Sequence, residues 1–149
     1  MKNPYIQAWH HVAFSCKDIK PMIAFFRDSL GFEVDWEHEK RSGKAMDEVV
    51  GLTDADAHVA MMKGYGTRVE LFQYRNPKGR DLGSRQQCDP GLIHICLQVN
   101  NIKELYQQLL EQGVDFNCPP NNLRPGVWAT YMIGPEDLTI ELVQYDESQ

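Results

Sequence analysis

The sequence predicts an α+β protein made of two βαβββ modules in one chain, which form a curved sheet around a metal-binding cavity. Short runs with the two-residue period of strands alternate with two helical stretches, and the same order of elements occurs twice. The chain has 149 residues, of which 42% are hydrophobic, enough for one domain with a buried core. We therefore predict a single domain over residues 1–149, with modules at about 5–75 and 91–146 and a linker at 76–90.

In the first module a strand is followed by a helix over residues 19–30. Asp18 is a suitable N-cap for this helix, and Gly31 is placed to end it. The apolar residues of the helix recur at spacings of three and four, at Ile23, Phe26 and Leu30. The strands are expected at 9–16, 32–38, 57–63 and 67–74, and the polar stretch 40–56 interrupts them with at most a short turn of helix.

The second module repeats this order. Its helix is capped by Asn100 or Asn101 and ends at Gly113. The apolar face of the helix consists of Ile102, Leu105, Leu109 and Leu110. The strands are expected at 92–99, 114–117, 127–133 and 138–144, and the proline-rich residues 118–126 are predicted to form a loop.

Matching segments support a duplication. HVA at residues 11–13 resembles HIC at residues 94–96, which lies 83 positions later. VELFQY at residues 69–74 resembles IELVQY at residues 140–145, which lies 71 positions later. The second separation is shorter, so the first module must contain additional residues before its last strand, and the stretch 40–56 accounts for them.

Composition excludes several classes of protein. Fifteen basic and 21 acidic residues give a net charge of −6, which disfavours nucleic-acid binding. No apolar run approaches the roughly 20 residues of a membrane span, and the N-terminus has no apolar signal core, so we expect a cytoplasmic protein without membrane contact. None of the four cysteines forms a CxxC pair. Cys16 and Cys96 lie in apolar strands and are predicted to be buried free thiols.

Strand alternation places one His and one Glu of each module on the sheet face that points away from the helices. A carboxylate buried on such a face is costly unless it is paired or bound to a cation. A single strand His or Glu usually has a structural or surface role, but recurrence in both modules favours a metal site. The predicted ligands are His11, Glu70, His94 and Glu141. They would hold one divalent ion, which could be Ni, Zn, Co, Mn or Fe.

Other histidines compete with this set. His10 adjoins His11, but a two-residue period would send it to the opposite face. His38 and His58 have no counterpart in the second module, and we predict that they are surface residues. Residues predicted to contact a substrate lie near the same face or near strand ends: Phe72, Tyr74, Arg124, Trp128 and Tyr145. For Trp128, packing in the core is an equal alternative.

Three segments carry a resemblance to a known family. HVAFSCKDI at residues 11–19 and FFRDSLGF at residues 25–32 resemble the opening of the vicinal oxygen chelate superfamily, and GPEDLTIEL at residues 134–142 resembles its closing segment. Members include glyoxalase I, methylmalonyl-CoA epimerase, extradiol dioxygenases and bleomycin-resistance proteins. The ligand order His, Glu, His, Glu is similar to that of bacterial glyoxalase I.

The resemblance implies a metal-dependent lyase or isomerase of the glyoxalase I type. It would act on a small oxygen-chelating substrate by proton transfer through a metal-bound enediolate, with Glu141 as the main base and Glu70 sharing its work. The alternatives are a CoA-ester epimerase, an extradiol dioxygenase and a non-catalytic drug-binding module. The resemblance also implies a homodimer, with sites formed within one chain or exchanged between two.

Overall fold

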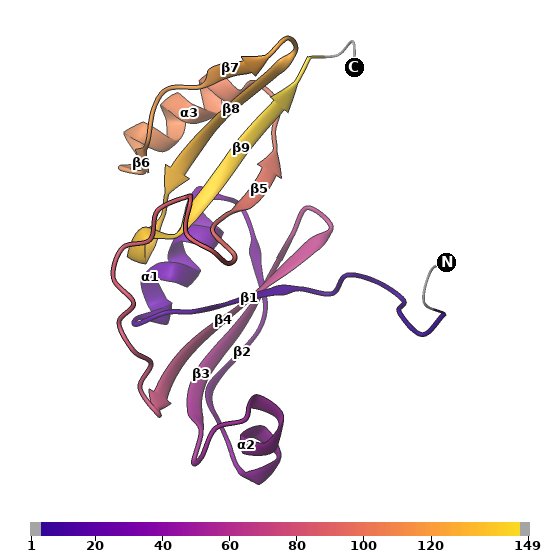
Figure 1. Cartoon of the computed structure of the whole chain (residues 1–149), viewed down its shortest axis with the longest axis vertical. Coiled ribbons are helices and arrows are strands. Elements are labelled where there is room, and N and C mark those ends of the chain that lie inside the picture. The colour runs from indigo at the N-terminus through magenta and orange to yellow at the C-terminus, as the bar shows by residue number, and fades with distance from the viewer. Residues whose placement is uncertain (1–3, 147–149) are drawn as a thin grey trace. The chain divides into compact units, whose positions relative to one another are not determined.

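The computed structural model describes residues 4–146. The chain divides into two compact units, Met1–Arg80 and Asp81–Gln149, and the boundary falls inside the predicted linker. Each unit contains one sheet and a helix between its first two strands (Figure 1). The predicted α+β class with two such modules is therefore confirmed.

Unit 1 contains a four-stranded sheet in the order β1-β4-β3-β2. Its strands are β1 (Val12–Ser15), β2 (Glu33–Ser42), β3 (Asp56–Gly64) and β4 (Thr67–Asn76). β1 pairs with β4 in parallel, and the other pairs are antiparallel. The helix α1 (Ile19–Ala24) packs on β3 and β4, and the core between them contains Ile19, Phe26, Phe32, Met62 and Leu71.

The first helical segment has nearly the predicted extent, but it changes from an α-helix to a π-helix along its length. Asp18 accepts a hydrogen bond from the amide of Lys20, as expected for the N-cap, and the side chain of Gln73 accepts another from the amide of Ile19. After α1 the chain continues as the π-helix η1 (Phe25–Ser29), because the Leu30 amide donates to the carbonyl of Phe25 five residues earlier.

The additional residues of unit 1 form a helical insertion between β2 and β3. This insertion contains α2 (Lys44–Val50), which lies at one end of the sheet in Figure 1. The Asp47 side chain accepts a hydrogen bond from the amide of Ala55 and so closes the insertion. The corresponding connection in unit 2 consists of Pro125 and Gly126 alone, which accounts for the different separations of the matching segments.

Unit 2 has its strands in the order β5-β9-β8-β6, with β7 also paired to β8. The strands are β5 (Ile95–Gln98), β6 (Asp115–Phe116), β7 (Asn121–Arg124), β8 (Val127–Ile133) and β9 (Thr139–Tyr145), and a 3-10 turn η2 (Pro135–Asp137) joins the last two. β5 and β9 are parallel.

The prediction of a continuous loop over residues 118–126 was wrong. β6 and β7 pair with the same edge of β8, and the interval between them contains Pro119 and Pro120. Proline has no amide proton for a strand ladder, so the two prolines divide one edge strand into two pieces.

The helix α3 (Ile102–Glu111) buries Ile102 and Leu109, but Leu110 is exposed, contrary to the prediction. Asn101 stands at the N-cap with φ of 52°, and the first helical amide donates to the side chain of Gln144. Gln144 therefore has the same role in unit 2 as Gln73 has in unit 1.

Two predictions about burial need correction. The four cysteines are free, as predicted, but Cys96 is exposed, because Ile95 and Leu97 take the positions of β5 that face the helix. The side chain of His58 is only 12% exposed, and its Nε2 atom lies 2.6 Å from Oε1 of Glu37, so His58 is not a surface residue. Within residues 4–146, none of the helices has the length and apolar character needed to cross a membrane.

Candidate functional site

In unit 1, His11 and Glu70 lie side by side. His11 immediately precedes β1, whose Ala13 is paired with Glu70 of β4. The Nε2 atom of His11 is 3.2 Å from Oε2 of Glu70, and the Glu70 side chain is only 12% exposed. An imidazole and a nearly buried carboxylate therefore meet on the sheet face opposite α1.

Unit 2 repeats this pair with the same atoms. His94 immediately precedes β5, whose Cys96 is paired with Glu141 of β9. The Nε2 atom of His94 is 3.4 Å from Oε2 of Glu141, whose side chain is 17% exposed. The four residues predicted as ligands thus form two equivalent pairs, one in each unit.

The spacing within each pair suits two ligands of one ion. A divalent ion bound at about 2.1 Å to two atoms holds them about 3.0 to 3.4 Å apart, for bond angles between about 90° and 109°. Imidazole nitrogen and carboxylate oxygen are ligands that first-row divalent metals accept. Each pair offers two such donors, and no larger metal-binding group of His, Cys, Asp or Glu occurs within either unit among residues 4–146.

The two carboxylates have different neighbours. Glu70 is flanked across the sheet by Ala13 and Met61, whereas Glu141 is flanked by Cys96 and Tyr131. Desolvation, the charge of Glu141 and a hydrogen bond to that carboxylate raise the pKa of Cys96 to about 12, so the thiol stays protonated. Burial and the same charge raise the pKa of Tyr131.

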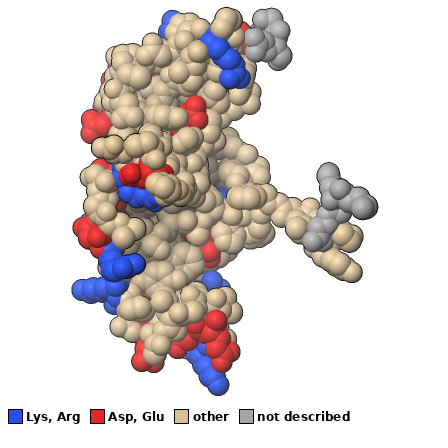
Figure 2. All heavy atoms as spheres, viewed as in Figure 1, with Lys and Arg blue, Asp and Glu red and all other residues tan. Residues whose placement is uncertain are grey.

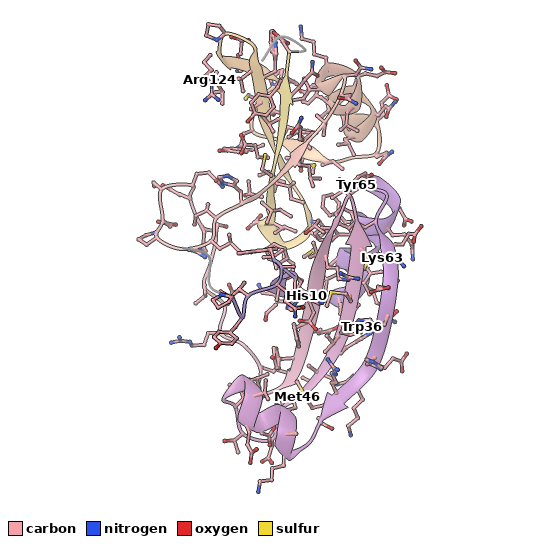
Figure 3. The ribbon with its side chains drawn as sticks, turned by 90° about the vertical axis from the view of Figure 1, so that its right-hand side faces the viewer. His10, Trp36, Met46, Lys63, Tyr65 and Arg124 are labelled. Carbon is pink, nitrogen blue, oxygen red and sulfur yellow. The ribbon has the colours of Figure 1, made fainter. Side chains whose placement is uncertain are left out.

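Aromatic side chains continue the Glu70 face along the strands. The rings of Phe72 and Tyr74 stack with their centres 5.4 Å apart. Burial is the main cause that raises the pKa of Tyr74, and the negative charge of Glu70 adds to it. In unit 2, Tyr145 lies on the Glu141 face opposite Val127. Val127 also pairs with Arg124, which ends the exposed strand β7 and is labelled in Figure 3.

Trp128 lies elsewhere. It is paired with Gln144, whose side chain caps α3, and Lys103 of that helix lies 4.4 Å from the centre of the indole ring. Trp128 is therefore on the helix side of the sheet, on the face opposite to that of Glu141, and not among the residues that could contact a substrate beside this carboxylate.

Sequence reasoning missed a second group of side chains on the Glu70 face. A register shift in β2 brings Trp36 opposite Met61, and His38 then lies opposite Val59. The guanidinium of Arg41 lies 5.2 Å from the Trp36 ring (Figure 3 labels Trp36). Strand alternation read from the sequence cannot locate such a register shift. The signal that could have indicated it is the occurrence of Trp36, His38 and Arg41 on one strand.

Charge on the surface is mixed. On the face drawn in Figure 2, acidic and basic side chains are interspersed in small groups. This pattern agrees with the net charge of −6 and offers no broad basic surface on that face.

Comparison with known proteins identifies one family and one curated relative. A family model described as "Glyoxalase/Bleomycin resistance protein/Dioxygenase superfamily" matches residues 8–141. A 2-epi-5-epi-valiolone epimerase of Actinomyces sp is 28% identical over 148 residues, which cover 94% of this chain and 80% of that protein.

Solved structures share the fold. A glyoxalase family protein from Bacillus cereus has a TM-score of 0.86 and 20% identity, with 97% of this chain and 98% of the other covered. The fosfomycin resistance protein FosX from Listeria monocytogenes has a TM-score of 0.66 and 14% identity, with 95% and 94% covered. At these identities the likeness shows the fold alone.

Proposed function

The chain belongs to the glyoxalase/bleomycin resistance protein/dioxygenase superfamily, and we propose that it is a divalent-metal-dependent enzyme that moves a proton at a carbon beside a carbonyl group. One observation carries this proposal. Each module places a histidine Nε2 and a glutamate Oε2 within 3.4 Å of each other, at equivalent positions of its sheet. We also propose that residues 1–149 act as one domain, with residues 76–90 as the linker between the modules.

The proposed ligands are His11, Glu70, His94 and Glu141, acting on one ion of Ni, Zn, Co, Mn or Fe. Such an ion, when bound, would polarise the substrate oxygens and make the neighbouring C–H bond more acidic. The imidazoles would serve only as ligands. The carboxylates have a second capacity, because a carboxylate oxygen can accept a proton from carbon and return it.

We infer that epimerisation is the first candidate reaction. Two carboxyl groups from two modules could act as a pair, with one ionised and one protonated. The ionised group would remove the proton from carbon, and the protonated group would supply its own proton in exchange. The relative in Actinomyces sp is named as an epimerase, which supports the same class. Proton return by the same carboxylate would instead give an isomerisation of the glyoxalase I type, which the order His, Glu, His, Glu favours.

The proposed substrate contacts are Phe72, Tyr74, Arg124 and Tyr145, and we add Trp36 and Arg41 to this proposal because they lie on the Glu70 face. Stacked and partly buried rings suit the carbon skeleton of a small substrate, and the arginines suit an anionic substituent. These side chains follow the strands that carry Glu70 and Glu141, so they would position a substrate relative to the carboxylates.

Deuterium exchange in D2O tests the proposal. The chain loaded with each of the five ions would be offered 2-epi-5-epi-valiolone, methylmalonyl-CoA and the glutathione adduct of methylglyoxal, and followed by NMR. We expect ion-dependent incorporation of deuterium into one substrate, with the product distinguishing epimerisation from isomerisation. Absence of exchange in all of them, or consumption of oxygen with a catechol, would contradict the proposal.

Assembly is tested with two inactive variants. We propose a homodimer, whose sites are formed within one chain or exchanged between two. His11→Ala and His94→Ala would each be inactive, and a mixture would regain activity only if a site takes its two pairs from different chains. Measurement of molecular mass by light scattering shows independently whether the dimer exists.

A further inference from the structure

The second ring nitrogen of each proposed ligand histidine is also occupied. Nδ1 of His94 lies 3.1 Å from Oε1 of Gln87, and Nδ1 of His11 lies 2.7 Å from Nδ1 of His10. Each ring is thus held at both nitrogens, with Nε2 beside a glutamate and Nδ1 beside a separate polar side chain.

The partner of His94 determines which nitrogen carries the proton. An amide oxygen only accepts hydrogen bonds, so the proton of this contact must be on Nδ1 of His94. A neutral imidazole has a single N–H group, which leaves the lone pair on Nε2, the atom that faces Glu141.

His10 can do the same for His11. The two rings meet edge to face with their centres 5.0 Å apart, and one Nδ1 must donate to the other. When His11 donates, its Nε2 is left with the lone pair beside Glu70. His10, which Figure 3 labels, lies before β1, and its ring contacts that of His11.

We propose that Gln87 and His10 are positioning residues that fix Nε2 as the metal-binding nitrogen of His94 and His11. This inference rests on the proposed function, because it assumes that the two histidines bind an ion. Metal-binding histidines commonly donate the other ring N–H to an outer acceptor, which fixes the ring orientation and makes the ligand more basic. The inference also gives the predicted linker a role, since Gln87 belongs to it.

The two modules reach this arrangement with unrelated residues. At the separation of 83 positions that relates His11 to His94, the counterpart of His10 is Ile93 and that of Gln87 is Pro4. Gln87 and His10 therefore have no counterparts in the sequence repeat. In both modules, however, Nδ1 of the histidine lies within hydrogen-bond distance of a polar side chain. A shared geometry from different residues points to a requirement of the imidazoles themselves.

Zinc titration of Gln87 variants, with the full chain, tests the proposal. Gln87→Ala should weaken zinc affinity about 10- to 100-fold, because the acceptor is lost. Gln87→Glu keeps an acceptor oxygen and should bind zinc at least as well as the wild type. Gln86→Ala is the matched control, since the Gln86 side chain contacts Cys88, and it should leave affinity unchanged. The melting temperature of each metal-free variant verifies folding.

Long-range ¹H–¹⁵N correlation spectra of the zinc-loaded chain give a readout independent of activity. We expect His94 and His11 to be protonated on Nδ1 and bound through Nε2. His10→Ala should weaken zinc binding, and His10→Gln, which supplies the acceptor used in unit 2, should restore it. Zinc bound through Nδ1 of the histidines would overturn this inference alone, and so would wild-type zinc affinity in both Gln87→Ala and His10→Ala. A wild-type chain that binds none of the five ions would overturn the proposed function and this inference together.

Discussion

The two modules carry the same His–Glu pair in different surroundings. In unit 1 the carboxylate of Glu70 has Ala13 and Met61 beside it, and the connection from β2 to β3 is a helical insertion. In unit 2 the carboxylate of Glu141 has the thiol of Cys96 beside it, and the connection is a two-residue turn. A duplicated framework therefore fixes the two His–Glu pairs, while the neighbouring residues can make the two halves unequal.

The largest expected effect concerns the two carboxylates. Glu70→Gln and Glu141→Gln should each lower kcat about 10²- to 10⁴-fold, because an amide cannot accept a proton from carbon. Single-turnover kinetics with the identified substrate would measure both. Equal losses with the ion still bound would indicate that both carboxyl groups transfer protons, as in an epimerase, and a large loss in Glu141→Gln alone would indicate one. Wild-type activity in either variant would exclude that residue as a base.

Core truncation compares the stability of the modules. Phe26 of unit 1 is fully buried and contacts both Phe25 and Phe32 edge to face, so Phe26→Ala should cost about 3 to 5 kcal/mol of unfolding free energy. Leu109→Ala in unit 2 should cost about 2 to 5 kcal/mol. Urea denaturation measures both, and a loss below 1 kcal/mol would contradict the packing described for that unit.

Helix capping gives a smaller and more specific difference. Gln144→Ala should cost about 1 kcal/mol, because the first amide of α3 loses its acceptor. Gln73→Ala should cost less, since Asp18 still caps the following amide of α1. Thermal unfolding measures both, with the exposed Gln98→Ala as control. A greater loss in Gln73→Ala would reverse this comparison.

Thiol alkylation examines the neighbour of Glu141. With a pKa of about 12, only about one Cys96 thiol in 10⁴ is ionised at pH 8, so Cys96 should react much more slowly with iodoacetamide than an ordinary exposed thiol. Mass spectrometry of peptides gives the rates. Glu141→Gln should accelerate the reaction because the negative charge is removed, and an unchanged rate would contradict the contact.

The smallest effect is a difference in sensitivity to acid. In unit 1, hydrogen bonds from Lys63 lower the pKa of Asp35, and those from Arg75 lower the pKa of Asp56. A lowered pKa adds stability above the unfolded value of about 3.9, and that stability is lost as the pH falls through the folded value. Hydrogen exchange between pH 5 and 3 should therefore show β2 and β3 loosening slightly before β8 and β9.

Sequence patterns located the two His–Glu pairs because duplication gave each His and each Glu a counterpart in the other module. The same patterns could not find Gln87 or His10, whose contacts depend on how an irregular segment returns to a strand end. Trp36 was missed because a register shift in β2 changed the face on which it lies. Local rules therefore predicted regular elements well, and failed where irregular backbone sets the direction of a side chain.

The outer strands of the two sheets also bear on the solubility of the protein. An unpaired strand edge can recruit another strand and start aggregation. β2 protects its edge with a dense series of charged residues, which repel a like strand, whereas prolines precede and follow the short strand β7. Neutralising the charges of β2 would therefore promote aggregation of the chain before it disturbed the fold. Replacing the prolines that flank β7 would lengthen this strand and expose a comparable edge in unit 2.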